Sequence, residues 1–301
     1  MEYSEIAEII KEAKPHLKDS SIKQYISSLK NLNKKATGSD ILVNFEFVNN
    51  PPYILDIIKD LHITSQRNTL TAIITILDDK QKELKDIYGK KVQELNKQQT
   101  ENYSKNVVSE KTDFKLKNWT TKDIEDNILQ LKIKQQYDTA LLLSLIYHYL
   151  FRNEVATLKL IKKSQYEKLT QEDKLKENYI VKHYSNMFIS RGVYKTSGKH
   201  GLILTKVDDK ILKSDLLSYI KTMKTNEFFP GMTNELVSKR ISRATSEFKD
   251  PVNKDSSFGL GTSSINKIVI ENLPGIEKLV QISKDRGTSI STLLQAYYNN
   301  Y

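Results

Sequence analysis

Apolar residues three and four positions apart recur through residues 3–100 and predict a succession of short amphipathic helices. The clearest stripe follows Ser20 and Ser21, which suit a helix N-terminus, and ends near Gly38, which suits a C-terminus. A later stripe begins at Pro51, because proline fits the first turn of a helix. The main expected helices cover residues 20–38, 51–61, 64–77 and 81–98. Residues 1–100 are therefore predicted to form a compact domain of four or five helices.

The helical pattern stops between residues 101 and 118. No period persists there and large apolar residues are few, which is typical of a linker. A second domain is expected over residues 119–301. It contains the most apolar segment of the chain, residues 137–151, which is predicted to be a buried helix.

After Val155 the apolar residues alternate or form short runs, which is the pattern of strands. Three such runs are TLKLIK, ENYIVKH and NMFISR. A β-hairpin is expected after them, with strands at 192–196 and 201–207 and a Ser197-Gly198 turn. From Asp208 onward the pattern is helical again. The expected fold class is mainly α with a small antiparallel β-sheet, an α+β protein.

Charge adds a class of partner to this picture. The 301 residues contain 47 Lys and Arg against 37 Asp and Glu, a net charge of +10, which favours a polyanionic partner. Zero cysteines exclude a disulfide scaffold and thiolate zinc sites, and no motif indicates another metal or a cofactor. No apolar run is long enough for a membrane span, and acids occupy the N-terminus, so an intracellular protein without a membrane partner is expected.

Four short segments contain the candidate chemistry. Segment 151–160, FRNEVATLKL, follows the apolar helix, and segment 194–201, YKTSGKHG, is the expected hairpin. Segment 287–298, GTSISTLLQAYY, ends in two tyrosines, and segment 261–268, GTSSINKI, precedes it. In this order they resemble the motifs of tyrosine recombinases, the phage-type integrases, and most of all the versions carried by large eukaryotic DNA viruses and their mobile elements. The resemblance implies a helical core-binding-like domain at 1–100 and a catalytic domain at 119–301.

Arg152 matches the family's first catalytic arginine. A guanidinium fork binds two nonbridging oxygens of a pentacoordinate phosphorane, whose extra negative charge it neutralises. The chain has only six arginines among its 47 basic residues, so this placement is notable. The alternative is an arginine that caps the helix it ends, with Glu154 as its partner.

Lys195 is similar to the family's hairpin lysine, and Lys199 is the second choice. The resemblance implies that this lysine reaches into the minor groove and protonates the departing 5′ oxygen, a general-acid role. The alternative is a basic hairpin tip that only touches phosphate.

Tyr297 lies in register with the family's nucleophile, and Tyr298 is one residue late. A tyrosine phenol forms a phosphotyrosyl ester that stores the energy of the cut strand, so rejoining needs no cofactor. The alternative is an aromatic residue that docks a C-terminal helix, which is credible in a chain with 16 tyrosines.

Three matched positions depart from the family pattern. Ser263 and Asn266 stand where His and the second Arg of a His-x-x-Arg motif are expected, and Thr288 stands at the second His. Lys267 and Arg286 are possible replacements for the missing charge, although neither is at a matched position. The resemblance therefore implies a degenerate or rewired active site.

The predicted partner is double-stranded DNA, bound by a homotetramer that is a monomer or dimer when free. Arg67, at a helix N-terminus in the first domain, is a candidate phosphate contact, as are Lys239, Arg240 and Arg243 on one helical face. Two functions stay open: a recombinase with a degenerate site, and an inactive descendant that binds DNA in a sequence-specific or architectural role. A type IB topoisomerase is disfavoured because residues 3–100 read as all-helical. The nucleus, or a viral factory in the cytoplasm if the protein is viral, is the expected location.

Overall fold

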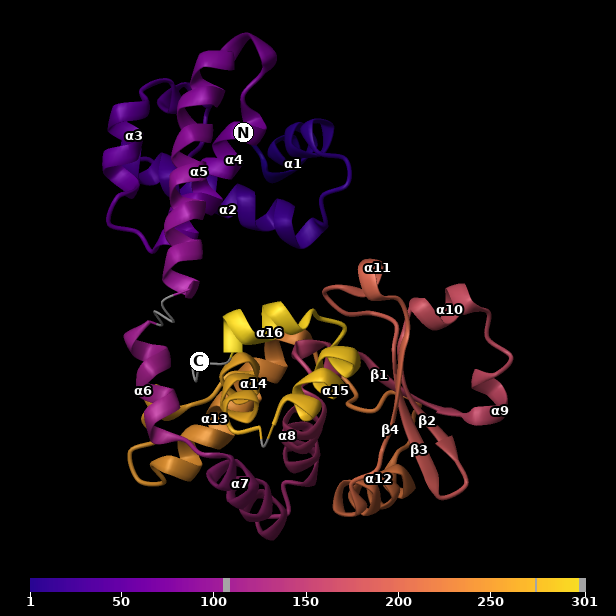
Figure 1. Cartoon of the computed structure of the whole chain (residues 1–301). Helices are drawn as coiled ribbons and strands as arrows, with labels where there is room; N and C mark the ends of the chain where they lie inside the picture. Colours follow the sequence, from indigo (N-terminus) through magenta and orange to yellow (C-terminus); the bar gives the residue numbers. More distant parts are fainter. Residues whose placement is uncertain (105–108, 274, 298–301) are drawn as a thin grey trace. The chain divides into compact units, whose positions relative to one another are not determined.

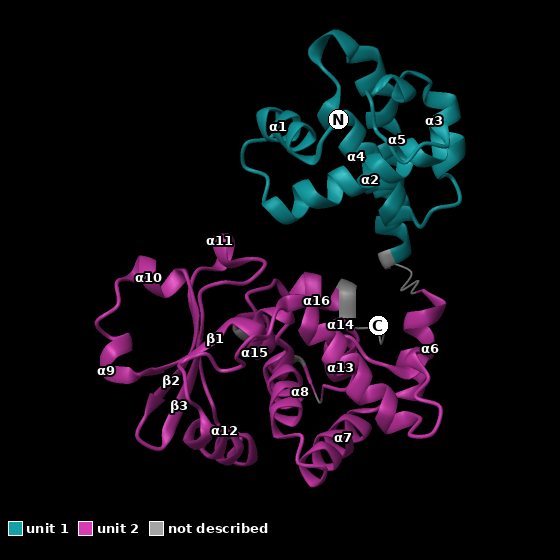
Figure 2. Ribbon diagram, turned by 180° about the vertical axis from the view of Figure 1, so that it is seen from behind, with its two compact units in different colours: residues 1–105 teal, residues 106–301 magenta. Residues whose placement is uncertain are grey.

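The computed structural model describes residues 1–104, 109–273 and 275–297. The chain divides into two compact units, Met1–Lys105 and Asn106–Tyr301 (Figure 2). No helix in the described ranges is long and apolar enough to cross a membrane. Each unit has its own hydrophobic core.

The first unit is helical, as the apolar stripes predict (Figure 1). Its core is centred on α4, where Leu70, Ala72 and Ile73 are fully buried. Tyr88 of α5 is also buried and donates its hydroxyl to the Val48 carbonyl at 2.6 Å. The helices are α1 Tyr3–Ala13, α2 Asp19–Thr37, η1 Glu46–Asn49, α3 Pro51–Ile58, α4 Ile63–Ile76, η2 Asp79–Gln81 and α5 Lys82–Ser104.

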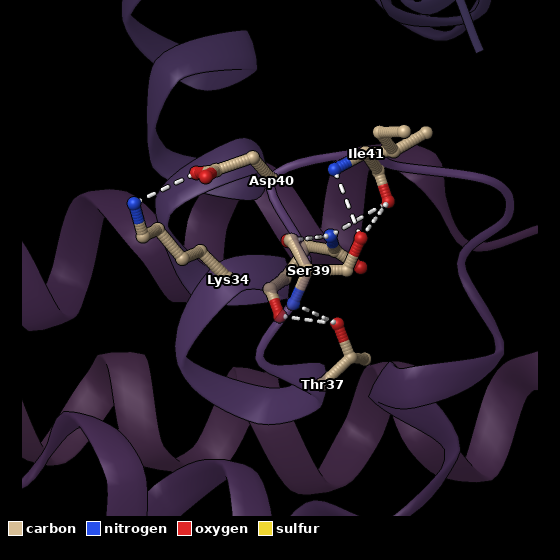
Figure 3. Close-up of polar contacts among 6 residues, drawn as sticks. Lys34, Thr37, Ser39, Asp40 and Ile41 are labelled. Carbon is tan, nitrogen blue, oxygen red and sulfur yellow. Dashed lines mark hydrogen bonds and ion pairs between the residues drawn. The ribbon is translucent and has the colours of Figure 1, made fainter.

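Helix α2 ends where its sequence predicts, at a left-handed Gly38 with φ of 75°. The buried Asn33 amide donates to the carbonyls of Ser39 at 2.9 Å and Ile41 at 3.1 Å, and so stabilises the turn that follows. Lys34 and Asp40 form an exposed ion pair of 2.8 Å across the same turn (Figure 3).

The second unit packs its helices around α8, Tyr137–Tyr149. Every residue from Thr139 to Ile146 is buried, which confirms the predicted buried helix. The other long helices are α6 Glu110–Asn118, α7 Thr121–Ile133, α12 Lys210–Thr222, α13 Asn234–Lys249, α14 Thr262–Glu271, α15 Ile276–Arg286 and α16 Ile290–Tyr297.

The sheet is mixed, whereas the sequence predicted an antiparallel one. Its order is β1-β2-β3-β4, with β1 parallel to β2 and the other pairs antiparallel. The chain crosses over between β1 and β2 through α9 Lys163–Tyr166 and α10 Gln171–Leu175, so β2 starts at the same end as β1 (Figure 1). The strands are β1 Leu158–Lys162, β2 Asn178–His183, β3 Asn186–Arg191 and β4 Ile203–Lys206. The α+β class is confirmed.

The predicted hairpin at 192–207 is wrong in detail, because residues 192–196 form no strand. The Asn178 side-chain oxygen accepts the backbone N–H groups of Gly192 and Val193, both at 3.0 Å, and the Gly192 N–H also donates to the Glu177 carbonyl at 3.2 Å. The helical turn α11, Ser197–His200, stands where a tight Ser197-Gly198 turn was expected. The connection from β3 to β4 is thus a loop with a helical turn.

The predicted linker 101–118 is also too long. Helix α5 continues to Ser104, and α6 covers most of the second half of this stretch. The buried Lys115 of α6 donates to the Gly259 carbonyl, and Trp119 donates its indole N–H to Phe258 at 2.8 Å. Helix α6 therefore belongs to the second unit.

Candidate functional site

A pocket of about 200 Å³ in the second unit collects residues from three separate segments of the chain. Five residues predicted from the sequence line it, namely Arg152, Lys195, Lys199, Arg286 and Thr288. The remaining lining residues are Glu154, Tyr194, Thr196, His200, Ser289 and Thr292. Residues more than 130 positions apart thus meet in one place.

Arg152 follows the end of the buried helix α8. That helix ends at Leu150, a buried residue in the left-handed region with φ of 51°. The fully buried Asn266 of α14 donates its amide to the carbonyls of Leu150 at 3.3 Å and Phe151 at 3.4 Å. Asn266 thus anchors the backbone immediately before Arg152.

The residue after Arg152 is anchored as well. Asn153 accepts hydrogen bonds from Ser238 of α13 and Thr262 of α14, both at 3.1 Å. The residue before Arg152, Phe151, contacts the sheet: the guanidinium of the buried Arg191, at the end of β3, lies 4.9 Å from the centroid of its ring. Contacts with two helices and the sheet therefore fix the backbone position of Arg152.

The β3–β4 loop supplies Lys195, Lys199 and His200, all exposed. Tyr194 closes this loop by donating its hydroxyl to the Gly201 carbonyl at 2.7 Å. Thr196 donates its hydroxyl to the Gly287 carbonyl at 2.6 Å, a bond between the loop and the turn after α15.

Arg286 is the last residue of α15 and is only 6% exposed. The helix ends at Gly287, which is left-handed with φ of 58°. Ser283 stabilises the same turn by donating its hydroxyl to the Thr288 carbonyl at 2.6 Å. A Cβ atom at Gly287 would lie 2.6 Å from a ring carbon of Tyr194, so only glycine allows the loop to approach this closely.

The pocket carries an excess of positive charge. Four cationic residues line it against the single carboxylate of Glu154, a formal excess of three when His200 is neutral. Hydroxyl groups of Thr288, Ser289 and Thr292 add hydrogen-bond donors on one side. Guanidinium, ammonium and hydroxyl donors around one cavity suit a tetrahedral oxyanion such as a phosphodiester.

The other predicted residues of the second unit lie elsewhere or cannot be placed in the pocket. Ser263 is exposed on α14, and Lys267 on the same helix lies near Glu271, where its charge opposes a burial-driven rise in the pKa of that carboxyl. Asn266 is the buried anchor described above. Tyr297 is the last residue of α16, and the placement of its side chain is outside the described structure. Tyr298 lies outside the described residues.

The predicted DNA-contact residues have two different surroundings. Arg67 donates to Asn96 at 3.3 Å and to Gln99 at 2.5 Å, and so connects α4 to α5 within the first unit. Three exposed cations of α13, Lys239, Arg240 and Arg243, line a groove of about 1580 Å³.

Several residues that line the pocket were not among the predicted site residues, although they lie in the predicted segments. Tyr194, Thr196 and His200 belong to the segment that contains the candidate lysines. Ser289 and Thr292 belong to the segment that ends in the candidate tyrosine. Their hydroxyl and imidazole groups, which can bind phosphate, were the signal in the sequence that could have identified them.

No group of three or more His, Cys, Asp or Glu residues in the described parts of the chain is arranged to hold a metal ion. The chain matches none of the protein-family models, curated proteins or solved structures with which it was compared. Its function is therefore inferred from the pocket and the motifs.

Proposed function

We propose that the protein is a DNA-binding tyrosine recombinase with a rewired active site, which cuts and rejoins DNA through a 3′-phosphotyrosyl intermediate. The observation that carries this proposal is the convergence of Arg152 and Arg286 on one pocket with Lys195 and Lys199. Arg286 replaces the second arginine that the sequence lacks at Asn266.

In the proposed reaction, Arg152 and Arg286 bind the nonbridging oxygens of the scissile phosphate. The Tyr297 oxygen attacks phosphorus, its proton passes to solvent, and the bond from phosphorus to the 5′ oxygen breaks. Lys195 gives a proton to that 5′ oxygen. Charge is thus neutralised where it develops in the transition state, which is the largest contribution to many enzymatic rates.

The proposed partner is double-stranded DNA, since the net charge is +10. The proposed assembly on DNA is a homotetramer, with a monomer or dimer free in solution. No cofactor is required, and the proposed location is inside the cell, in the nucleus or a viral factory.

A second candidate is an inactive recombinase-like protein that acts as a sequence-specific or architectural DNA-binding protein. Two observations favour it. Ser263 and Thr288 carry no imidazole, and Asn266 is fully buried as a helix anchor. The pocket would then bind a DNA phosphate without cleaving it.

A nicked suicide duplex distinguishes the two candidates, because release of the short strand traps any covalent adduct on a denaturing gel. Loss of the adduct in Tyr297→Phe supports the recombinase. Arg286→Ala is expected to lower adduct formation by about 100-fold or more, comparable to loss of an oxyanion donor. Lys122→Ala, an exposed cation on α7 outside the pocket and the α13 groove, is the control and is expected to form adduct as the parent protein does.

If the Arg152→Ala or Arg286→Ala variant formed as much adduct as the wild-type protein, that arginine would not bind the scissile phosphate. DNA binding without any adduct would favour the second candidate. Absence of DNA binding at low salt would contradict both.

A further inference from the structure

The groove along α13 differs chemically from the Arg152 pocket. Four cations line it, Lys239, Arg240, Arg243 and Lys254, against the carboxylates of Asp138 and Glu247, and Glu247 pairs with Lys254 at 3.9 Å. The exposed Tyr137 lies in the same groove. A cationic groove with an exposed aromatic side chain suits a nucleic-acid backbone whose bases are partly unstacked.

A smaller cavity of about 250 Å³ adjoins this groove. Gln136, Ala244 and Glu247 line both, so the cavity and the groove share a wall. Its apolar surface consists of Leu131, Ala244, Phe248 and Pro251. Since an apolar cavity of about 150 Å³ holds benzene, this cavity has the volume for a bicyclic aromatic ring.

Side-chain amides supply the polar part of the cavity. Asn127 is only 2% exposed, and its carbonyl oxygen has no hydrogen-bond partner in the described parts of the chain. Gln130 and Gln136 are exposed at the rim, together with Lys134. Primary amides offer a donor and an acceptor side by side, which is the arrangement that pairs with the edge of adenine.

We infer that this cavity receives one unpaired purine base of a DNA strand lying in the α13 groove. Arg240 and Arg243 contact the phosphates, and the strand passes Ala244 and Glu247, the residues of α13 that line both the groove and the cavity. The ring lies against Phe248 and Leu131, and Asn127, Gln130 and Gln136 bind its edge. This inference rests on the proposed DNA-binding function and names a base site that the Arg152 chemistry does not require.

The test measures fluorescence anisotropy of the full chain with three labelled duplexes of one sequence at one salt concentration. The first is fully paired, the second has a single bulged adenine, and the third has an abasic nucleotide at the same bulge. The bulge bends both of the last two duplexes, so their comparison isolates the base. The adenine bulge is expected to bind about tenfold more tightly than the abasic bulge, the effect of one good bidentate contact.

Two variants locate the effect. The first is Asn127→Leu, and the second is a double variant that combines Gln130→Ala with Gln136→Ala. Each is expected to reduce the tenfold ratio to about one and to leave the affinity for the fully paired duplex unchanged. Gln171→Ala, an exposed amide on α10, is the matched control and keeps the ratio. The double variant changes only exposed side chains, so it tests the cavity even if Asn127→Leu fails to fold.

Equal affinity of the wild-type protein for the adenine and abasic bulges would overturn this inference alone. A preference that survives in both variants would also overturn it, because the base would then bind elsewhere. If none of the three duplexes bound, the proposed function would fail and this inference with it.

Discussion

Thr196 donates its hydroxyl to the backbone carbonyl of Gly287 at 2.6 Å. The two residues directly follow Lys195 and Arg286 in sequence, so one hydrogen bond connects the loop that carries the lysine to the helix end that carries the arginine. Tyr194 packs against the same glycine, as the short distance from its ring to the Gly287 Cβ position shows. The spacing of the two cations in the pocket therefore depends on this contact.

Replacement of Thr196 by valine keeps the shape of the side chain and removes the donor. We expect strand cleavage to fall about tenfold, because Lys195 and Arg286 lose their fixed spacing. Loss of a single, partly buried hydrogen bond costs about 1–3 kcal/mol, which lowers the melting temperature of a unit of this size by about 2–12 °C. Thr196→Ser restores the hydroxyl and is expected to recover most of the rate in a single-turnover cleavage assay. Equal rates for Val and Ser would show that the bond is irrelevant to the chemistry.

Gly287→Ala combines a left-handed backbone with a close contact to Tyr194. We expect a loss of about 2 kcal/mol or more, seen as a lower midpoint in urea unfolding. Gly198→Ala is the matched control, because a Cβ there meets nothing within 4 Å and the residue lies in the helical turn α11. Equal stability of the two variants would contradict the proposed packing of the loop.

Asn266→Arg places an arginine at the position where the tyrosine recombinases that the sequence resembles carry one. Because Asn266 is fully buried and bonds two carbonyls at the end of α8, we expect this change to destabilise the protein by about 3 kcal/mol or more and not to raise activity. The neighbouring Lys267→Arg, on a half-buried residue that keeps its charge, should leave the melting temperature nearly unchanged. Increased adduct yield from a folded Asn266→Arg protein would show that the pocket extends to this position.

Burial raises the pKa of Tyr88 to about 12, above the value of about 10 in an unfolded chain. The folded protein therefore keeps a proton that the unfolded chain loses. The resulting stability of roughly 2–3 kcal/mol is fully present below pH 10 and is lost as the pH rises through 12. Tyr88→Phe is less stable at pH 8 because the Val48 carbonyl loses its donor. Urea unfolding from pH 8 to 12 is expected to show the free energies of unfolding of the two proteins converging. A constant difference between them over this pH range would contradict the raised pKa of Tyr88.

The sequence predicts elements better than it predicts their connections. Helix α8 was evident because the apolar segment 137–151 is longer than a typical strand, and eight consecutive residues within it are buried. The parallel pairing of β1 and β2 was not evident, because strand direction depends on where the crossover returns the chain. Residues 192–196 alternate like a strand, yet the Asn178 side chain takes two of their N–H groups, a tertiary contact that no local pattern encodes.

In the site, too, local patterns were predictable and tertiary packing was not. Arg152, Lys195 and Lys199 were found because they follow recognisable local patterns. Arg286 was only a possible substitute, since its distance from Tyr297 fits no motif and its place in the pocket arises from the packing of α15. Asn266 stands where tyrosine recombinases have their second arginine, but its burial against the end of α8 gives it a structural role that spacing alone does not reveal.

Helix α16 is held by an apolar cluster separate from the main core, in which Leu293 packs with Leu150, Ile270 and Leu279. A cluster this small contributes far less free energy than the main core, so α15 and α16 open at a lower cost than the whole unit unfolds. Such local unfolding removes Arg286 from the pocket while Arg152 stays in place. A ligand that bridges both arginines therefore binds only the form in which these helices are folded, and it raises the free energy of that local opening.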